Sequence, residues 1–252
     1  MRIAVFSDIH GNCLALDTIL ADLGRHPVDQ IVCLGDAILG GAQPAETASR
    51  LRVLDCPVVL GNADAWLLSG DEHTLVQELS PAQRAIREWT YAQLTPDDQA
   101  FLGTFQPTLE INLGISRPLL CFHGSPSSYD DILLPTTPDD EFQQIVGDYH
   151  QFILAGGHTH LQQIRRWGET LFFNPGSVGF VRDLQWQDAG FRFYPWAEYA
   201  ILTVDGSSLG LEFRRVPVEI AKLLLTIRAS GRPDAEILAG RYEQRVGEHP
   251  GT

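Results

Sequence analysis

Short apolar runs alternate with amphipathic segments along the N-terminal part of the chain. The runs cover residues 2–6, 30–34 and 57–60, and each ends at a polar loop, as buried strands do. Between them, residues 12–23 carry apolar side chains at helical spacing, and residues 44–54 have the pattern of a second helix. Strands that alternate with helices in this way predict β-α-β units and a mostly parallel sheet.

The pattern changes between residues 64 and 105, where it predicts helices and no strand. Ser80 and Gln83 are three residues apart and Pro81 stands at the first helical position, so they predict a capping box that starts a helix. A shorter helix is expected after Thr95. We interpret this segment as a helical insertion, because insertions between strand ends often form lids or cap one side of a pocket.

Strands resume after the insertion, and the chain closes with helices. Apolar or alternating segments predict strands at residues 109–113, 118–122, 152–155, 162–167, 169–174, 197–204 and 210–216, with a helix at 139–147. The C-terminal part is expected to be mainly helical, with a break at residues 231–233. We expect residues 1–252 to form a single domain, with the helical insertion at about 64–105 and a C-terminal helical segment at about 218–246.

Composition and charge exclude several classes of function. Of the 252 residues, 44% are hydrophobic, so the chain can bury a sizeable core. It has 18 Lys and Arg against 32 Asp and Glu, and the net charge of −14 argues against binding to duplex nucleic acid or to an anionic membrane surface. No apolar run approaches the roughly 18–20 residues of a membrane helix. A small anionic substrate is still compatible with this charge, because a bound cation can invert the local field.

The cysteines and aromatic residues bear on location and assembly. No Cys-x-x-Cys pair is present, and the cysteines lie in or beside apolar segments: Cys13, Cys33, Cys56 and Cys121. We interpret them as buried thiols in a reducing compartment, and the N-terminus has no signal-peptide pattern, so we expect a cytoplasmic protein. Aromatic residues are dense between residues 191 and 199, which indicates core packing or a subunit interface and is compatible with a homodimer.

Side chains of one chemical type follow five of the predicted strands. They are carboxylates, imidazoles and one amide: Asp8, His10, Asp36, Asn62, His123, His158 and His160. Because ligands of open α/β sheets bind outside the carboxyl ends of the strands, we expect these residues to gather at one edge. An oxygen and nitrogen set without a thiolate suits manganese, iron, zinc, nickel or cobalt and argues against a structural zinc site. Seven side chains exceed the need of one ion and suit two ions that share a bridging carboxylate.

The five blocks also resemble a known family. Asp8-Ile9-His10, Gly35-Asp36, Gly61-Asn62, His123-Gly124 and Gly157-His158-Thr159-His160 are similar, in order and in kind, to the motifs of the calcineurin-like metallophosphoesterase superfamily. The resemblance extends from residue 3 to about residue 179 and is nearest to the small bacterial and archaeal phosphodiesterases. It implies an α/β fold, a four-layer α/β/β/α sandwich of two mixed sheets with a small helical insertion.

The resemblance further implies a dinuclear metal centre, with manganese as the expected metal. The first ion would be held by Asp8, His10 and His160, and the second by Asn62, His123 and His158. Asp36 would bridge the ions, and a hydroxide between them would attack phosphorus in line. Of these residues, the resemblance gives catalytic roles to Asp36, Asn62 and His10.

One position departs from the family pattern. Larger members have a His after Gly-Asn that acts as the leaving-group acid, but this chain has Ala63, which can neither donate a proton nor bind a phosphate. Loss of a positioned acid typically costs about 10²–10⁴-fold on a poor leaving group, so we expect weak activity on alkyl monoesters. His73 is a candidate replacement acid. Arg182 and Ser177 are candidate substrate contacts, although an ion pair and a plain turn explain them equally well.

The leading hypothesis is a metal-dependent phosphoric ester hydrolase, a phosphodiesterase, that acts on a small phosphate-ester substrate. A second hypothesis is a phosphomonoesterase, including a protein phosphatase, or a dinucleoside polyphosphate hydrolase. A third is a non-catalytic scaffold that uses the same fold for protein contacts, as a relative in membrane trafficking does after losing ligand residues. This chain retains all seven candidate ligands, which favours the enzyme hypotheses.

Overall fold

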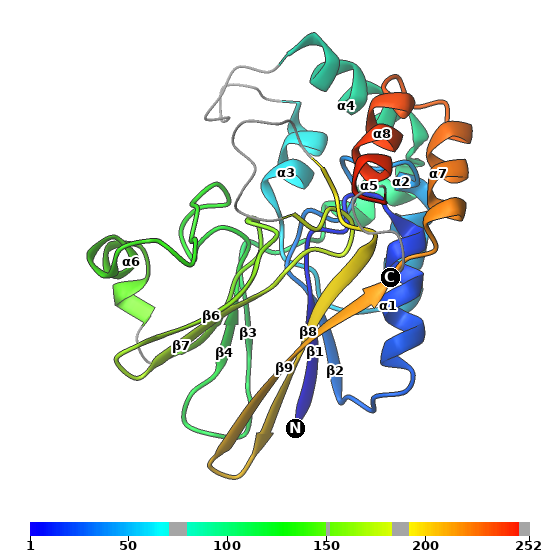
Figure 1. Ribbon diagram of the computed structural model, residues 1–252. Helices are drawn as coiled ribbons and strands as arrows, with labels where there is room; N and C mark the ends of the chain where they lie inside the picture. The colour runs from blue at the N-terminus through cyan, green and yellow to red at the C-terminus, as the bar shows by residue number, and fades with distance from the viewer. Residues whose placement is uncertain (71–79, 150–151, 183–191, 247–252) are drawn as a thin grey trace.

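The computed structural model describes the chain except for residues 71–79, 150–151, 183–191 and 247–252 (Figure 1). The strands are β1 (Arg2–Phe6), β2 (Gln30–Cys33), β3 (Leu109–Ile111), β4 (Leu119–Cys121), β5 (Ile153–Ala155), β6 (Gln162–Trp167), β7 (Thr170–Pro175), β8 (Trp196–Asp205) and β9 (Ser208–Pro217). The helices are α1 (Cys13–Leu23), α2 (Pro44–Leu54), α3 (Asn62–Ser69), α4 (Pro81–Gln93), α5 (Pro96–Leu102), α6 (Asp139–Val146), α7 (Ile220–Ala229) and α8 (Ala235–Val246), with a short 3₁₀ turn, η2 (Gly147–Tyr149).

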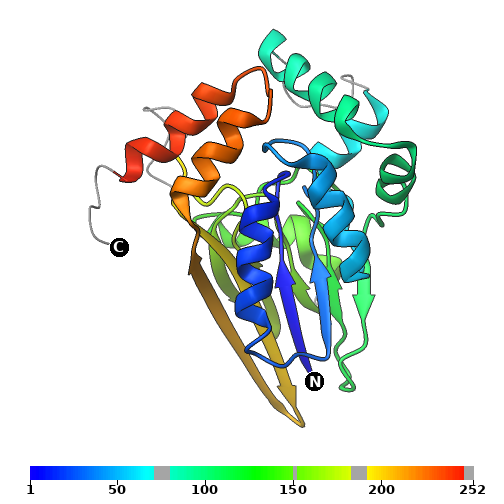
Figure 2. The same cartoon turned by 90° about the vertical axis from the view of Figure 1, so that its right-hand side faces the viewer.

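Two mixed sheets form the centre of the molecule. The first has the strand order β2-β1-β8-β9, in which β1 and β2 are parallel and the others antiparallel. The second has the order β3-β4-β5-β7-β6, with β4, β5 and β7 parallel and an antiparallel strand at each edge. Strands β1, β2, β4 and β5 run toward the same end of the molecule, so the loops that follow them are brought together (Figures 1 and 2).

Three buried clusters produce the four-layer α/β/β/α sandwich that the resemblance implied. Between the sheets, aliphatic residues of β1, β2 and β8 pack against β4, β5 and β7, with Phe173 fully buried among them. The outer face of the first sheet is covered by α1 and α2 (Figure 2), where Leu16 and Ile19 pack on Phe6. The outer face of the second sheet is covered by α6 through Phe142 and Val146.

The helical segments match their predicted positions closely. The Ser80 hydroxyl accepts a hydrogen bond from the Gln83 backbone, and the Gln83 side chain accepts one from the Ser80 backbone, which completes the predicted capping box of α4. The C-terminal segment consists of α7 and α8, and the break between them falls at the predicted place. Among the described residues, no helix is long and apolar enough to cross a bilayer.

The strand predicted at residues 57–60 is wrong. Residues 58 and 59 form only single bridges, Val58 with Cys33 and Val59 with Gln106. Pairing changes from β2, at Val58, to the segment after α5, at Val59. Pairing cannot extend toward the N-terminus because Pro57 lacks a backbone N–H, and it cannot extend toward the C-terminus because α3 begins directly after Gly61. There is therefore no room for a continuous ladder.

The aromatic-rich segment between residues 191 and 199 was expected to form core packing or a subunit interface. The aromatic residues between 191 and 199 belong to the fold where they are described: Phe193 and Tyr199 are buried in the core under α7 and α8. Core packing therefore accounts for these two aromatic residues.

Burial between the sheets predicts that two leucines of one hairpin contribute unequally to the free energy of unfolding. Leu202 in β8 is 1% exposed between the sheets, whereas Leu209 in β9 is 41% exposed. We expect Leu202→Ala to lower the free energy of unfolding by about 2–5 kcal/mol, since it leaves a cavity, and Leu209→Ala to change it by about 0.5 kcal/mol or less. Urea unfolding followed by circular dichroism measures both. Equal losses in the two variants would contradict the assigned packing.

Candidate metal centre

Loops at the carboxyl ends of four strands carry the candidate ligands. Asp8 and His10 follow β1, Asp36 follows β2, His123 follows β4, and His158 and His160 follow β5, while Asn62 is the first residue of α3. Five of them have a left-handed backbone, with φ values of 56° (Asp8), 50° (His10), 49° (Asp36), 69° (His158) and 59° (His160). Such residues cost about 1–3 kcal/mol each and cluster at functional sites.

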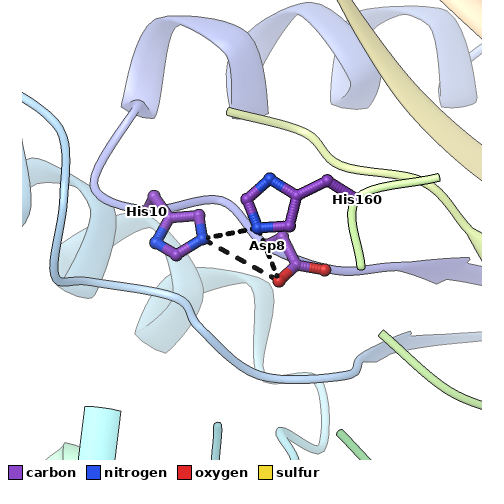
Figure 3. A group of neighbouring side chains, drawn as sticks. All are labelled: Asp8, His10 and His160. Atoms are coloured by element: carbon purple, nitrogen blue, oxygen red, sulfur yellow. Dashed lines mark hydrogen bonds and ion pairs between the residues drawn. The ribbon is translucent and has the colours of Figure 1, made fainter. Parts of the chain in front are cut away.

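The first candidate group consists of Asp8, His10 and His160, whose ligand atoms all lie within 4.8 Å of one another (Figure 3). The Nε2 atoms of His10 and His160 are 3.1 Å apart. Asp8 Oδ1 lies 3.3 Å from Nε2 of His160 and 3.8 Å from Nε2 of His10. All three side chains are buried, and no described donor satisfies Asp8 Oδ1.

Backbone carbonyls fix the tautomers of both rings. His10 Nδ1 is 2.7 Å from the Leu39 carbonyl, and His160 Nδ1 is 2.8 Å from the Phe180 carbonyl. Because a carbonyl oxygen only accepts, both Nδ1 atoms donate, and in the neutral rings each Nε2 carries a lone pair. With both rings neutral, as a bound cation requires, two lone pairs and a carboxylate oxygen would face one another in a buried space. Such a set fits a divalent cation with nitrogen and oxygen ligands.

The second candidate group consists of Asp36, His123 and His158, again with ligand atoms within 4.8 Å of one another. His123 Nδ1 donates to the Leu34 carbonyl at 2.8 Å, which directs Nε2 into the group. Asn62 Oδ1 lies 3.1 Å from that Nε2, so the Asn62 side chain borders the same group.

Asp36 lies where the two groups meet. Its Oδ2 is 3.4 Å from Nε2 of His123 and 3.7 Å from Nε2 of His10. Its Oδ1 accepts the Ala63 backbone N–H at 2.9 Å. A Cβ atom at Gly61 would approach Asp36 Oδ1 to 2.2 Å, so glycine is required there for this approach. The arrangement leaves Oδ2 facing both groups.

Burial and neighbouring charges set the protonation states. Burial lowers the pKa of His10 and lowers that of His158 to about 4, so both rings are neutral at neutral pH. Burial alone would raise the pKa of Asp8, but His160 and His123 together outweigh it and lower this pKa to about 2. Burial alone would lower the pKa of His123, but the carboxylates of Asp36 and Asp8, with the Leu34 carbonyl, together outweigh it and raise this pKa to about 10.

Asp64 is a residue of the site that sequence reasoning did not assign. Its side chain is fully buried and accepts the backbone N–H groups of Ala37, at 2.9 and 3.1 Å, and of Ile38, at 3.1 Å. It thereby holds the loop directly after Asp36. Burial, with the nearby Asp36 charge, raises the pKa of Asp64 to about 7. The only sequence signal was its position two residues after Asn62.

The predicted substrate contacts lie in different surroundings. Ser177 is fully buried, and its hydroxyl donates to the Asp8 carbonyl and accepts the Phe180 N–H, both at 2.8 Å. This geometry favours a role in holding the Asp8 loop over substrate binding. Arg182 donates from Nε to the Thr159 carbonyl at 3.3 Å, which places it beside the loop between His158 and His160. His73 lies outside the described residues.

A groove beside Asn62 was not foreseen. It has a volume of about 310 Å³ and is lined by Pro107, Ser125, Pro126, Ser127, Ser128, Tyr129 and Asp130. The Asp130 carboxyl interacts with the Asn62 side chain, and burial together with the charge of Asp36 raises its pKa. The groove therefore lies on the Asn62 side of the second group, and none of the seven candidate ligands lines it.

Two mixed sheets with adjoining clusters of carboxylates and imidazoles at their strand ends define a metal-binding α/β protein. Residues 1–205 match the calcineurin-like phosphoesterase superfamily domain. An uncharacterised protein of Methanocaldococcus jannaschii is 30% identical over 196 residues, which cover 72% of this chain and 77% of that protein. The chain belongs to the calcineurin-like phosphoesterase superfamily, whose members use divalent metals.

Solved structures share this fold. A metallophosphoesterase from Sphaerobacter thermophilus superposes with a TM-score of 0.72 at 27% identity, over 96% of this chain and 97% of that one. A hypothetical protein from Pyrococcus horikoshii superposes with a TM-score of 0.77 at 19% identity, over 94% and 97% of the two chains. The likeness extends over nearly the whole chain, including the part beyond residue 205.

The raised pKa of His123 predicts that metal binding releases a proton. With a pKa of about 10, His123 holds this proton in the metal-free protein at neutral pH, and a cation on Nε2 must displace it. We expect the apparent affinity of the second group to rise about tenfold per pH unit between pH 6 and 9. Titration calorimetry of the chelator-stripped protein in two buffers of different ionisation enthalpy should show about one proton released. Affinity independent of pH would contradict this protonation state.

Proposed function

We propose that this chain is a phosphodiesterase that uses two divalent transition-metal ions. The observation that carries the proposal is the position of Asp36, whose Oδ2 faces His10 on one side and His123 on the other. One carboxylate that serves two adjoining groups is the arrangement expected of a dinuclear site. We propose manganese as the first metal to test, because the ligands are carboxylate, imidazole and amide groups.

The proposed ligands are those that the resemblance assigned. Asp8, His10 and His160 would hold the first ion, His123, His158 and Asn62 the second, and Asp36 both. When bound, two such ions supply Lewis-acid chemistry, which lowers the pKa of water and neutralises charge on a phosphoryl group.

The protein itself supplies orientation. The carbonyls of Leu39 and Phe180 keep the first group's rings aimed at the site, and Asp64 holds the loop that carries Asp36. We propose that Arg182, next to the His158–His160 loop, presents its guanidinium to a substrate phosphate.

One feature limits the leaving group, and another supports a diester as substrate. Ala63 borders Asp36 through its backbone and offers no side-chain proton, so an alkyl leaving group would depart unassisted from a monoester and from a diester alike. The groove beside Asn62 provides room for the second substituent that a diester carries on phosphorus. Phosphoanhydrides, such as dinucleoside polyphosphates, are the alternative that Ala63 disfavours least, because their leaving groups need little protonation.

The proposal is tested by metal-dependent turnover of an activated diester. The protein is stripped with chelator, reloaded with Mn²⁺ and assayed on bis-p-nitrophenyl phosphate and p-nitrophenyl phosphate, with metal content measured in parallel. We expect diester turnover that requires the metal and falls at least about 10²-fold in Asp36→Asn. Turnover of neither ester, together with unchanged metal content in Asp36→Asn, would overturn the proposal. Turnover of anhydrides alone would move it to that substrate class.

Restoring an acid at Ala63 should change selectivity among leaving groups. We expect Ala63→His to raise kcat/KM for an alkyl phosphate ester by about 10²-fold or less, and to leave p-nitrophenyl esters nearly unchanged, because only the poor leaving group needs a proton. Ala63→Gln, of similar size but without an acid, is the matched control. An equal gain with both leaving groups, or with Gln, would contradict the assignment of Ala63 as the missing acid position.

A further inference from the structure

The C-terminal helices α7 and α8 lie beyond residues 1–205, the part that matches the family domain, yet they pack at the end of the molecule where the candidate ligands gather (Figures 1 and 2). We propose that this helix pair positions His10 and His160 for metal binding, through Arg232 and Tyr242. The inference rests on the proposed two-metal function and concerns the first group alone.

Arg232 connects the turn between α7 and α8 to the loop behind His10. Its side chain is buried, and Nη1 donates to the carbonyls of Gly40 and, at 3.1 Å, of Gly41. Asp234 holds the other edge of the guanidinium, with Nη2 to Oδ2 at 3.1 Å. The peptide groups that Arg232 fixes come directly after Leu39, whose carbonyl accepts the His10 Nδ1–H.

Tyr242 makes the equivalent contact behind His160. It is buried in α8, and its hydroxyl donates to the Gly179 carbonyl at 2.5 Å. The next carbonyl, that of Phe180, accepts the His160 Nδ1–H at 2.8 Å. Each helix-pair contact therefore fixes a peptide group adjacent to the carbonyl that orients one imidazole.

A stack of rings reinforces these hydrogen bonds. The His10 ring lies on Phe180, with centroids 4.9 Å apart, and Phe180 lies on Phe193 at 4.4 Å. Phe193 in turn contacts Tyr242 at 5.4 Å. A Cβ atom at Gly40 would lie 3.0 Å from Phe180 and 3.1 Å from His10, so glycine keeps the loop close to both rings. Movement of α8 would thus be transmitted to the His10 ring.

The second group is supported from other parts of the fold. Its His123 ring is oriented by the Leu34 carbonyl after β2, and the loop after Asp36 is held by Asp64 of α3. Loss of the contacts from α7 and α8 should therefore weaken one metal site and spare the other. A purely structural role of the helices would not distinguish the two sites.

The test uses the full chain and Co²⁺ or Mn²⁺ as the probe. Tyr242→Phe removes only the hydroxyl that holds Gly179, and Tyr199→Phe is its matched control, because that buried hydroxyl donates to Asp22, at 2.7 Å, away from the ligands. Groups that hydrogen-bond to metal ligands typically contribute 10–100-fold in affinity, and Tyr242 acts one peptide group further out, so we expect Tyr242→Phe to weaken one of two bound ions by up to about tenfold. Tyr199→Phe should bind both ions as the wild type does.

Ligand variants identify the affected site. In a His160→Asn background, which disables the first group, Tyr242→Phe should leave the affinity of the remaining ion unchanged. In a His158→Asn background it should weaken the remaining ion by up to about tenfold. Thermal unfolding, calorimetric titration and metal content after dialysis are measured for every variant.

The outcomes separate the two proposals. If the wild type binds two ions and Tyr242→Phe binds them as tightly, or weakens both ions equally, the positioning role is overturned while the metal centre stands. If the wild type binds no ion, the two-metal function itself fails, and the positioning role fails with it. Selective weakening of the first site establishes the positioning role.

Discussion

The structure depends on one electrostatic constraint, which is that ring nitrogens and carboxylate oxygens able to bind a cation are held close together in a buried space. The Nε2 atoms of His10 and His160 are 3.1 Å apart beside Asp8 Oδ1, and backbone carbonyls hold the donor protons on the far side of both rings. Such an arrangement is unfavourable alone and favourable around a cation. The rest of the site follows from the need to hold it: Asp64 ties down the loop after Asp36, and the Ser177 hydroxyl ties down the loop after β1.

The backbone carries part of the cost of this arrangement. Five candidate ligands have positive φ, and each costs on the order of 1–3 kcal/mol relative to ordinary backbone. Asp and His tolerate this region better than branched residues, because their short polar side chains bond locally. The strain persists because the strands before these loops are buried on both faces, between the two sheets and under the helices. A rigid sheet thus determines the conformation of loops that would not adopt it alone.

Strand periodicity predicted most of the elements, and the polar residues after each strand placed the ligands at one edge, because both are local signals. The four-layer sandwich itself was implied by the family resemblance. The sequence missed what depends on long-range contact. Residues 57–60 have the composition of a strand, but neighbours on two sides reduce them to single bridges. Ser177 follows a turn motif, and only the folded chain shows its hydroxyl bound to the Asp8 loop. Arg232 and Tyr242 donate to backbone carbonyls that are distant in sequence. Every residue has a backbone carbonyl, so the sequence does not indicate which one a side chain will contact.

Each candidate group takes its side chains from both sheets. In the first, Asp8 and His10 follow β1 of one sheet and His160 follows β5 of the other. In the second, Asp36 follows β2, whereas His123 and His158 follow strands of the opposite sheet. A cation bound to either group would therefore link the two layers, so metal affinity and the packing between the sheets are thermodynamically coupled. Residues that do not contact the ligands can then affect metal affinity through the same coupling. Tyr242 would do so by fixing the position of one layer's loop relative to the loops of the other layer.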